Sequence, residues 1–136
     1  MAPIVIDSSA TVAWFMPDEQ SPDGQALLDR VVENGAVVPG IWHLKVGNAL
    51  LYGLRRRRIS PAQRMEALLQ LARLPISVDP ETTARSWDDT LILADRFELT
   101  LYDASYLELA HRRGLPLASL DRALRKAAGQ FDVVLA

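Results

Sequence analysis

Three aspartates stand where the chain changes from an extended run to an expected helix. Asp7 ends the β-branched run PIVI, and Asp121 ends the apolar run LPLASL. Asp103 follows LTLY, a short run rich in β-forming residues. Ligands collect at the carboxyl ends of the strands in an open parallel sheet. The three carboxylates are therefore expected at one sheet edge, although each aspartate alone also suits a helix N-cap or a turn.

Carboxylates brought together in this way would repel one another. A pair of like charges 4 Å apart costs about 4 kcal/mol at an effective dielectric of 20. A divalent cation removes that cost, and Mg²⁺ and Mn²⁺ prefer oxygen ligands. Such an ion can generate hydroxide from water and stabilise the leaving oxygen of a phosphodiester. The pattern thus indicates metal-assisted phosphodiester chemistry.

Composition sets outer bounds on the protein. Its 136 residues, 49% hydrophobic and 24% charged, suit one soluble domain over residues 1–136. The net charge of −2 does not indicate nucleic-acid binding by the chain as a whole, so such a partner needs a local basic patch. With no cysteine, a disulfide framework and a thiolate metal site are excluded, and a reducing cytoplasm is compatible. No apolar run is long enough to span a membrane.

Hydrophobic periodicity predicts strands alternating with helices. This alternation favours an α/β fold with a mainly parallel central sheet. Expected strands are 3–6, 36–39, 76–78, 115–120 and 131–135, with a further β-like run at 99–102. Expected helices are 10–15, 25–33, 41–58, 61–74, 80–97, 104–113 and 120–128.

Four motifs follow one another along almost the whole chain. They are Val5-Ile6-Asp7-Ser8-Ser9, residues 38–51 (VPGIWHLKVGNALL), residues 99–110 (LTLYDASYLELA) and residues 114–128 (GLPLASLDRALRKAA). Together they resemble those of PIN-domain ribonucleases, specifically the toxin subunits of VapBC-type toxin–antitoxin pairs. The resemblance implies a three-layer α/β/α sandwich and a pocket of four acids that holds Mg²⁺ or Mn²⁺. It also implies endonucleolytic cleavage of RNA in a bacterial cytoplasm, a cognate antitoxin, and a homodimer within a larger toxin–antitoxin assembly.

The resemblance extends to individual residues. Asp7, Asp103 and Asp121 match three of the four acids of that pocket. Ser8 or Ser9, together with Ser119, could orient a carboxylate or a metal-bound water, or could simply cap and turn the chain. Asn48 lies one helical turn beyond the fourth acid position and could hold that side chain by a hydrogen bond.

Lys45 stands where the resemblance places the fourth acid, a glutamate three residues after Trp42. A protonated lysine cannot ligate a hard cation. Among three aspartates it turns repulsion into attraction and should oppose metal entry. Two interpretations remain open, an inactivated variant of an active toxin and a natural member with weakened or lost catalysis.

A run of four arginines, Arg55, Arg56, Arg57 and Arg58, closes the same helix. Cations at a helix C-terminus suit the helix dipole, and they could also contact RNA phosphates near the pocket.

Together, the resemblance and Lys45 predict a metal-dependent endoribonuclease toxin impaired at Lys45. The alternative is a silent binding module that engages antitoxin or RNA without cleavage.

Overall fold

A parallel four-stranded sheet forms the centre of the computed structural model, which describes residues 2–136. Its strands lie in the order β3-β2-β1-β4, and each adjacent pair is parallel. Every residue of the central strand β1 is fully buried. The strands are β1 (Ile4–Ile6), β2 (Ala36–Val38), β3 (Ile76–Val78) and β4 (Leu117–Ala118).

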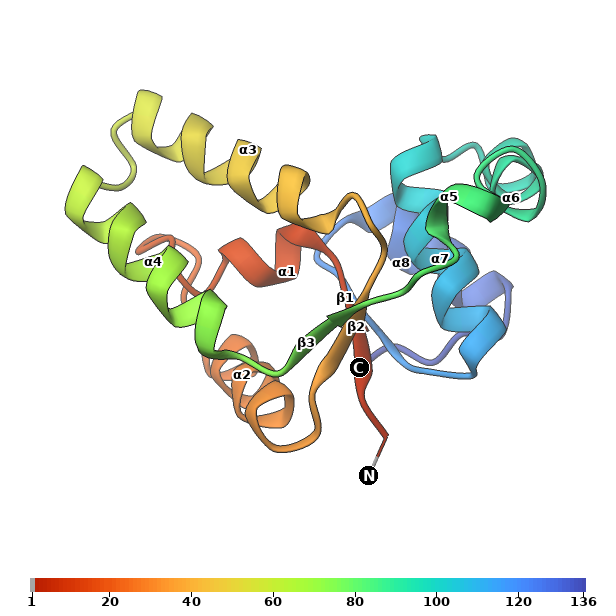
Figure 1. Ribbon diagram of the computed structural model, residues 1–136, viewed down its shortest axis with the longest axis horizontal. Coiled ribbons are helices and arrows are strands. Elements are labelled where there is room, and N and C mark those ends of the chain that lie inside the picture. Colours follow the sequence, from red (N-terminus) through yellow and green to blue (C-terminus); the bar gives the residue numbers. More distant parts are fainter. Residues whose placement is uncertain (1) are drawn as a thin grey trace.

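Helices cover both faces of this sheet, which makes the three-layer α/β/α sandwich expected from the sequence (Figure 1). Buried parallel strands require such double cover because both of their faces are apolar. One layer contains α1 (Ser8–Val12), α2 (Pro22–Asn34), α3 (Trp42–Arg55) and α4 (Pro61–Arg73). The other contains α5 (Thr82–Arg85), α6 (Asp89–Phe97), α7 (Leu101–Arg113) and α8 (Arg122–Gln130).

Helix α3 shows the expected amphipathic register. Its buried face packs against the core, and Gly53 permits this because a Cβ there would lie 2.7 Å from Met16 Cε. Gly47, another poor helix-interior residue from which the sequence suggests close packing, has no such neighbour, since no side chain of residues 2–136 lies within 4 Å of a Cβ built there. The buried stripe consists of Trp42, Val46, Leu50 and Gly53.

Residues 99–102 form no strand, which corrects the expected β-like run before Asp103. Helix α7 already begins at Leu101, and the Thr100 hydroxyl accepts a hydrogen bond from the backbone N–H of Asp103 at 3.1 Å. A Thr N-cap therefore outweighs the β preference of the LTLY run. Gly114, with φ 64°, closes this helix as expected.

Three other expected elements differ from the structure. The first helix begins at Ser8 rather than residue 10, because the carboxylate of Asp7, and not a serine, caps it. The helix expected over 80–97 is two helices, and Trp87 between them is 86% exposed. Instead of a last strand over 131–135, one bridge joins Leu135 to Leu117. Each helix within residues 2–136 is too short or too polar to cross a membrane.

Candidate active site

Asp7 lies at the carboxyl end of β1, where hydrogen bonds occupy both of its carboxylate oxygens. Ser9 Oγ donates to Oδ1 at 2.7 Å, and the backbone N–H of Ala10 donates to the same oxygen at 2.9 Å. Ser119 Oγ donates to Oδ2 at 2.5 Å. The side chain is almost fully buried. These contacts fix the direction of the Asp7 carboxylate.

The two serines also tie the end of β4 to the end of β1. Ser119 Oγ accepts the backbone N–H of Asp121 at 3.0 Å, and Ser9 Oγ accepts that of Leu120 at 3.0 Å. Asp121 caps α8 through its Oδ2 atom. Ser9 and Ser119 are therefore the serines that orient Asp7, whereas the described residues offer no hydrogen bond to the Ser8 side chain.

The pKa of Asp7 reflects opposing contributions. Burial raises it, the hydrogen bonds from Ser119, Ala10 and Ser9 lower it, and the charge of Asp121 raises it again. The balance leaves the pKa above its ordinary value. Burial therefore disfavours the ionised form of Asp7, and the hydrogen bonds offset only part of this free-energy cost.

Asp103 lies in the first turn of α7, half-buried and within range of three other charged side chains. Burial raises its pKa most, and the charges of Asp121 and Asp7 raise it further. The ammonium group of Lys45 lowers it. The charges of Asp7, Asp121 and Lys45 therefore all act on the Asp103 carboxylate.

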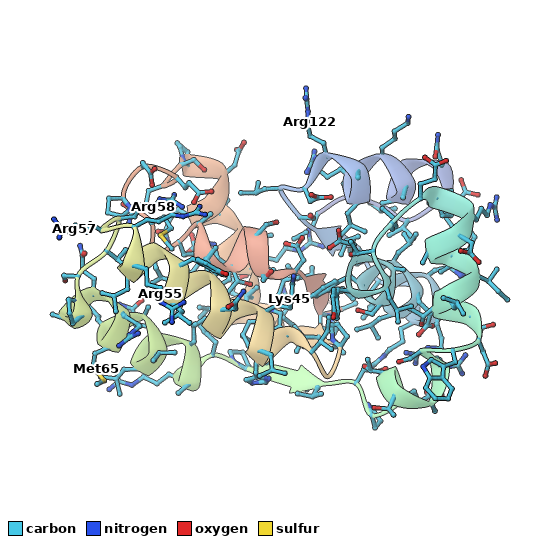
Figure 2. All side chains as sticks on the ribbon, turned by 90° about the horizontal axis from the view of Figure 1, so that it is seen from above. Lys45, Arg55, Arg57, Arg58, Met65 and Arg122 are labelled. Atoms are coloured by element: carbon cyan, nitrogen blue, oxygen red, sulfur yellow. The ribbon has the colours of Figure 1, made fainter. Side chains whose placement is uncertain are left out.

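Lys45 projects from α3 toward the amino-terminal end of α7. Its Nζ atom lies 5.2 Å from the centre of the Tyr102 ring. Viewed from above, its label stands near the middle of the molecule, where α3 passes the ends of the strands (Figure 2). The ammonium group therefore lies next to the residue that precedes Asp103, and not on a distant part of the surface.

The donor set does not fit a tightly held divalent cation. Carboxylate oxygens are the right ligands for Mg²⁺. However, residues 2–136 contain no group of three or more His, Cys, Asp or Glu side chains placed to hold a metal ion. Both oxygens of Asp7 point to hydrogen-bond donors, and Lys45 adds a positive charge. A cation would have to compete with these internal partners.

Known proteins resemble this chain in both sequence and structure. Residues 4–130 match the model of the PIN domain. The chain belongs to the PIN domain family. It is 27% identical over 121 residues to ribonuclease VapC3 of Pyrobaculum aerophilum, covering 89% of this chain and 91% of that protein. The crystal structure of PAE2754 from Pyrobaculum aerophilum superposes with a TM-score of 0.68 at 26% identity, covering 93% of this chain and 86% of that chain.

The remaining predicted residues of this PIN domain lie along or beyond α3. Asn48 is exposed, and none of the hydrogen bonds found in residues 2–136 involves its side chain. Arg55 ends α3, and Arg56 is its C-cap. Arg58 differs from the other arginines because it forms ion pairs of 2.8 Å with both Asp18 and Glu19.

Tyr106 is a member of the site that the sequence reasoning missed. It is 1% exposed, and its hydroxyl has no hydrogen-bond partner among residues 2–136. Burial and the charges of Asp7 and Asp103 raise its pKa, while the backbone N–H of Ser8, which lies near the hydroxyl but outside hydrogen-bond geometry, lowers it. The sequence could have identified Tyr106 by its position three residues after Asp103, because this spacing puts both residues on the same face of the helix.

Replacing Tyr106 with phenylalanine is expected to stabilise the protein. A buried hydroxyl without a partner costs free energy, so Tyr106→Phe should raise the free energy of unfolding by about 1 kcal/mol. Urea unfolding measures this change. Tyr102→Phe, which removes a hydroxyl from an exposed ring, is the matched control and should leave stability unchanged. A loss of stability in Tyr106→Phe would show that the hydroxyl has a hydrogen-bond partner.

Replacing Asp103 with asparagine is expected to stabilise the PIN domain in a pH-dependent way. The pKa of Asp103 is raised above 3.8 in the folded protein. Folding therefore favours the protonated carboxyl, and this contribution is lost as the pH rises through the folded pKa. Asp103→Asn cannot ionise, so its melting temperature should exceed that of the parent at neutral pH and converge with it near pH 3. A difference in melting temperature that does not change with pH would contradict the raised pKa of Asp103.

Proposed function

We propose that residues 1–136 act as one domain, a metal-dependent endoribonuclease toxin of the VapC type whose activity is impaired by Lys45. Mg²⁺ or Mn²⁺ would be its cofactor, RNA its substrate and the cytoplasm its compartment. Lys45 carries this proposal, because its ammonium group lies 5.2 Å from the ring centre of Tyr102, the residue before Asp103, and its charge acts on the Asp103 carboxyl. Membership of the PIN domain family and the likeness to ribonuclease VapC3 support the nuclease activity.

The chain's own residues would divide the work as follows. Ser9 and Ser119 hold the Asp7 carboxylate in one direction. Asp103 and Asp121 supply the neighbouring negative charge. Lys45 offsets part of that charge from within the protein, and so stabilises the pocket in the absence of any added ion.

RNA cleavage by matched variants tests this function. The parent protein and Lys45→Glu are incubated with total RNA and Mn²⁺ at the same salt concentration. Lys45→Glu should cut RNA, and the parent should cut it at least ten times more slowly. The double variant Lys45→Glu/Asp7→Asn should again be inactive, which excludes a contaminating nuclease. If Lys45→Glu binds Mn²⁺ but cleaves no RNA, the nuclease proposal is wrong.

A silent binding module remains the second candidate, because Lys45 favours the metal-free pocket. It predicts that the parent and Lys45→Glu bind RNA or antitoxin equally and that neither cleaves RNA. The same assay therefore separates the two functions.

A cognate antitoxin is the proposed protein partner, and homodimers would form part of the assembly. The apolar segment 10–15, which follows Asp7 closely in the sequence, suggests a contact surface for this partner, but Ala10, Val12 and Ala13 are buried. We propose exposed non-aromatic apolar side chains on α3 and α4 as the contact surface instead. They are Leu44, Met65, Leu68 and Leu69, at 46–79% exposure.

A further inference from the structure

One face of α3 carries a row of polar and aromatic side chains that leads away from the acidic residues. Lys45, Tyr52 and Arg56 follow one another at i, i+7 and i+11, which places them on one stripe of the helix. Asn48 and Arg55 flank the stripe. With a rise of 1.5 Å per residue, Tyr52 lies about 10 Å along the axis from Lys45.

Each end of this stripe pairs a cation with an exposed tyrosine ring. Lys45 Nζ lies 5.2 Å from the Tyr102 ring centre, and Arg56 Cζ lies 5.5 Å from that of Tyr52. Tyr102 is 55% exposed and Tyr52 is 47% exposed. The rings are therefore open to solvent while a positive charge is held beside each of them.

The arginines differ in what they bind within the protein. Arg58 is committed to Asp18 and Glu19. Among residues 2–136, no carboxylate forms an ion pair with Arg55 or Arg56, so their charges are free. Viewed from above, the labels of Lys45 and Arg55 mark two points along α3 (Figure 2). A positive strip thus exists on a chain whose net charge is −2.

We propose that this surface holds single-stranded RNA, with Tyr52 and Tyr102 each stacking on an unpaired base. We call it the α3 track, and it rests on the proposed function because it would lead RNA to the acidic residues. Exposed aromatic rings alternating with basic side chains are the combination that binds single strands, since every unpaired base offers a flat face for stacking. Base-paired RNA keeps its bases stacked on one another and denies them to the rings. The α3 track consists of Lys45, Asn48, Tyr52, Arg55, Arg56 and Tyr102.

Binding of a fluorescein-labelled oligouridylate, measured by anisotropy in EDTA, tests the α3 track. EDTA prevents cleavage, so binding is scored independently of catalysis. Tyr52→Ala and Tyr102→Ala should each raise Kd about 5- to 100-fold. Tyr52→Phe keeps the ring and should bind like the parent. A hairpin RNA of the same length should bind more weakly, and its Kd should not respond to Tyr52→Ala.

The salt dependence of the same binding tests the arginines. Neutralising one phosphate contact on a single strand changes the slope of log K against log salt by about 0.7. Arg56→Ala should therefore make the slope less steep by roughly 0.7. Arg73→Ala, at the far end of α4, removes the same charge off the track and should leave the slope unchanged.

Unchanged oligouridylate affinity in both tyrosine variants would overturn the proposal and leave the exposed stripe to a protein partner. The binding assay and the nuclease assay can fail independently of each other. If Lys45→Glu fails to cleave while the tyrosine variants lose binding, the α3 track stands without the nuclease. If Lys45→Glu cleaves and the tyrosine variants bind normally, the nuclease stands without the track.

Discussion

Replacing Lys45 with glutamate is expected to raise the affinity for Mn²⁺ about ten- to a hundredfold. Asp7, Asp103 and Asp121 carry a formal charge of −3. The Lys45 ammonium makes this −2, and a glutamate carboxylate would make it −4. One charge pair at 4 Å is worth about 4 kcal/mol at an effective dielectric of 20. Solvent and side-chain flexibility reduce the effect of the two added charges to on the order of 1 to 3 kcal/mol, which is the stated change in affinity.

Isothermal titration calorimetry with Mn²⁺ measures this change, and a third variant separates its two causes. Lys45→Gln removes the positive charge without adding a carboxylate, so its affinity should fall between those of the parent and Lys45→Glu. Equal affinity in all three proteins would show that Lys45 does not occupy the fourth acid position. A gain in Lys45→Gln as large as that in Lys45→Glu would show that the position supplies no ligand.

Local patterns were sufficient to predict where several residues of the candidate site lie in the fold. Asp7 and Ser119 lie at the ends of short apolar strands, and the parallel sheet brings such ends to one edge whatever the intervening chain does. The position of Lys45 came from the resemblance to PIN-domain toxins, and the buried stripe of Trp42, Val46 and Leu50 on α3 is consistent with that register. The chemistry of these residues stays a prediction that the proposed experiments test.

Other features depend on contacts that a linear pattern does not contain. The run before Asp103 reads as β-forming, yet a single Thr100 hydroxyl is enough to begin a helix there. Glu108 is 5% exposed in the middle of α7, at a position where apolar residues surround it in sequence. Its partner Arg112 also binds Asp79, 33 residues away. No spacing rule within one helix could have predicted that pairing.

Arg112 neutralises two buried carboxylates at once. Its Nη2 atom lies 2.6 Å from Asp79 Oδ2, and its Nε lies 2.8 Å from Glu108 Oε2. The side chains of Asp79 and Glu108 are only 2% and 6% exposed. The hydrogen bond to Glu108 and the contact with Asp79 hold the pKa of Arg112 above its ordinary value, although partial burial lowers it. The network ties the end of β3 to the last turn of α7.

Substituting methionine at Arg112 is therefore expected to destabilise the protein by about 3 kcal/mol, the lower end of the range for breaking a buried ion pair from one side. Arg113, at 3.8 Å from Asp79, keeps part of the compensation. This loss corresponds to a fall of roughly 10 °C in melting temperature. Arg85→Met is the matched control, because within residues 2–136 Arg85 forms ion pairs with Glu81 and Asp89 alone. These two carboxylates are 49% and 59% exposed, and exposed pairs contribute little.

The pH dependence of stability distinguishes lost charge from lost packing in Arg112→Met. Without Arg112, the folded protein holds two buried carboxylates that have lost the main opposite charge beside them, and burial disfavours an unpaired negative charge. Their protonation stabilises the variant at low pH, and this stabilisation is lost as the pH rises. The gap in melting temperature between parent and variant should therefore narrow between pH 7 and pH 4. A gap that stays constant, or an equal loss in Arg85→Met, would show that the buried carboxylates do not depend on Arg112 for their charge.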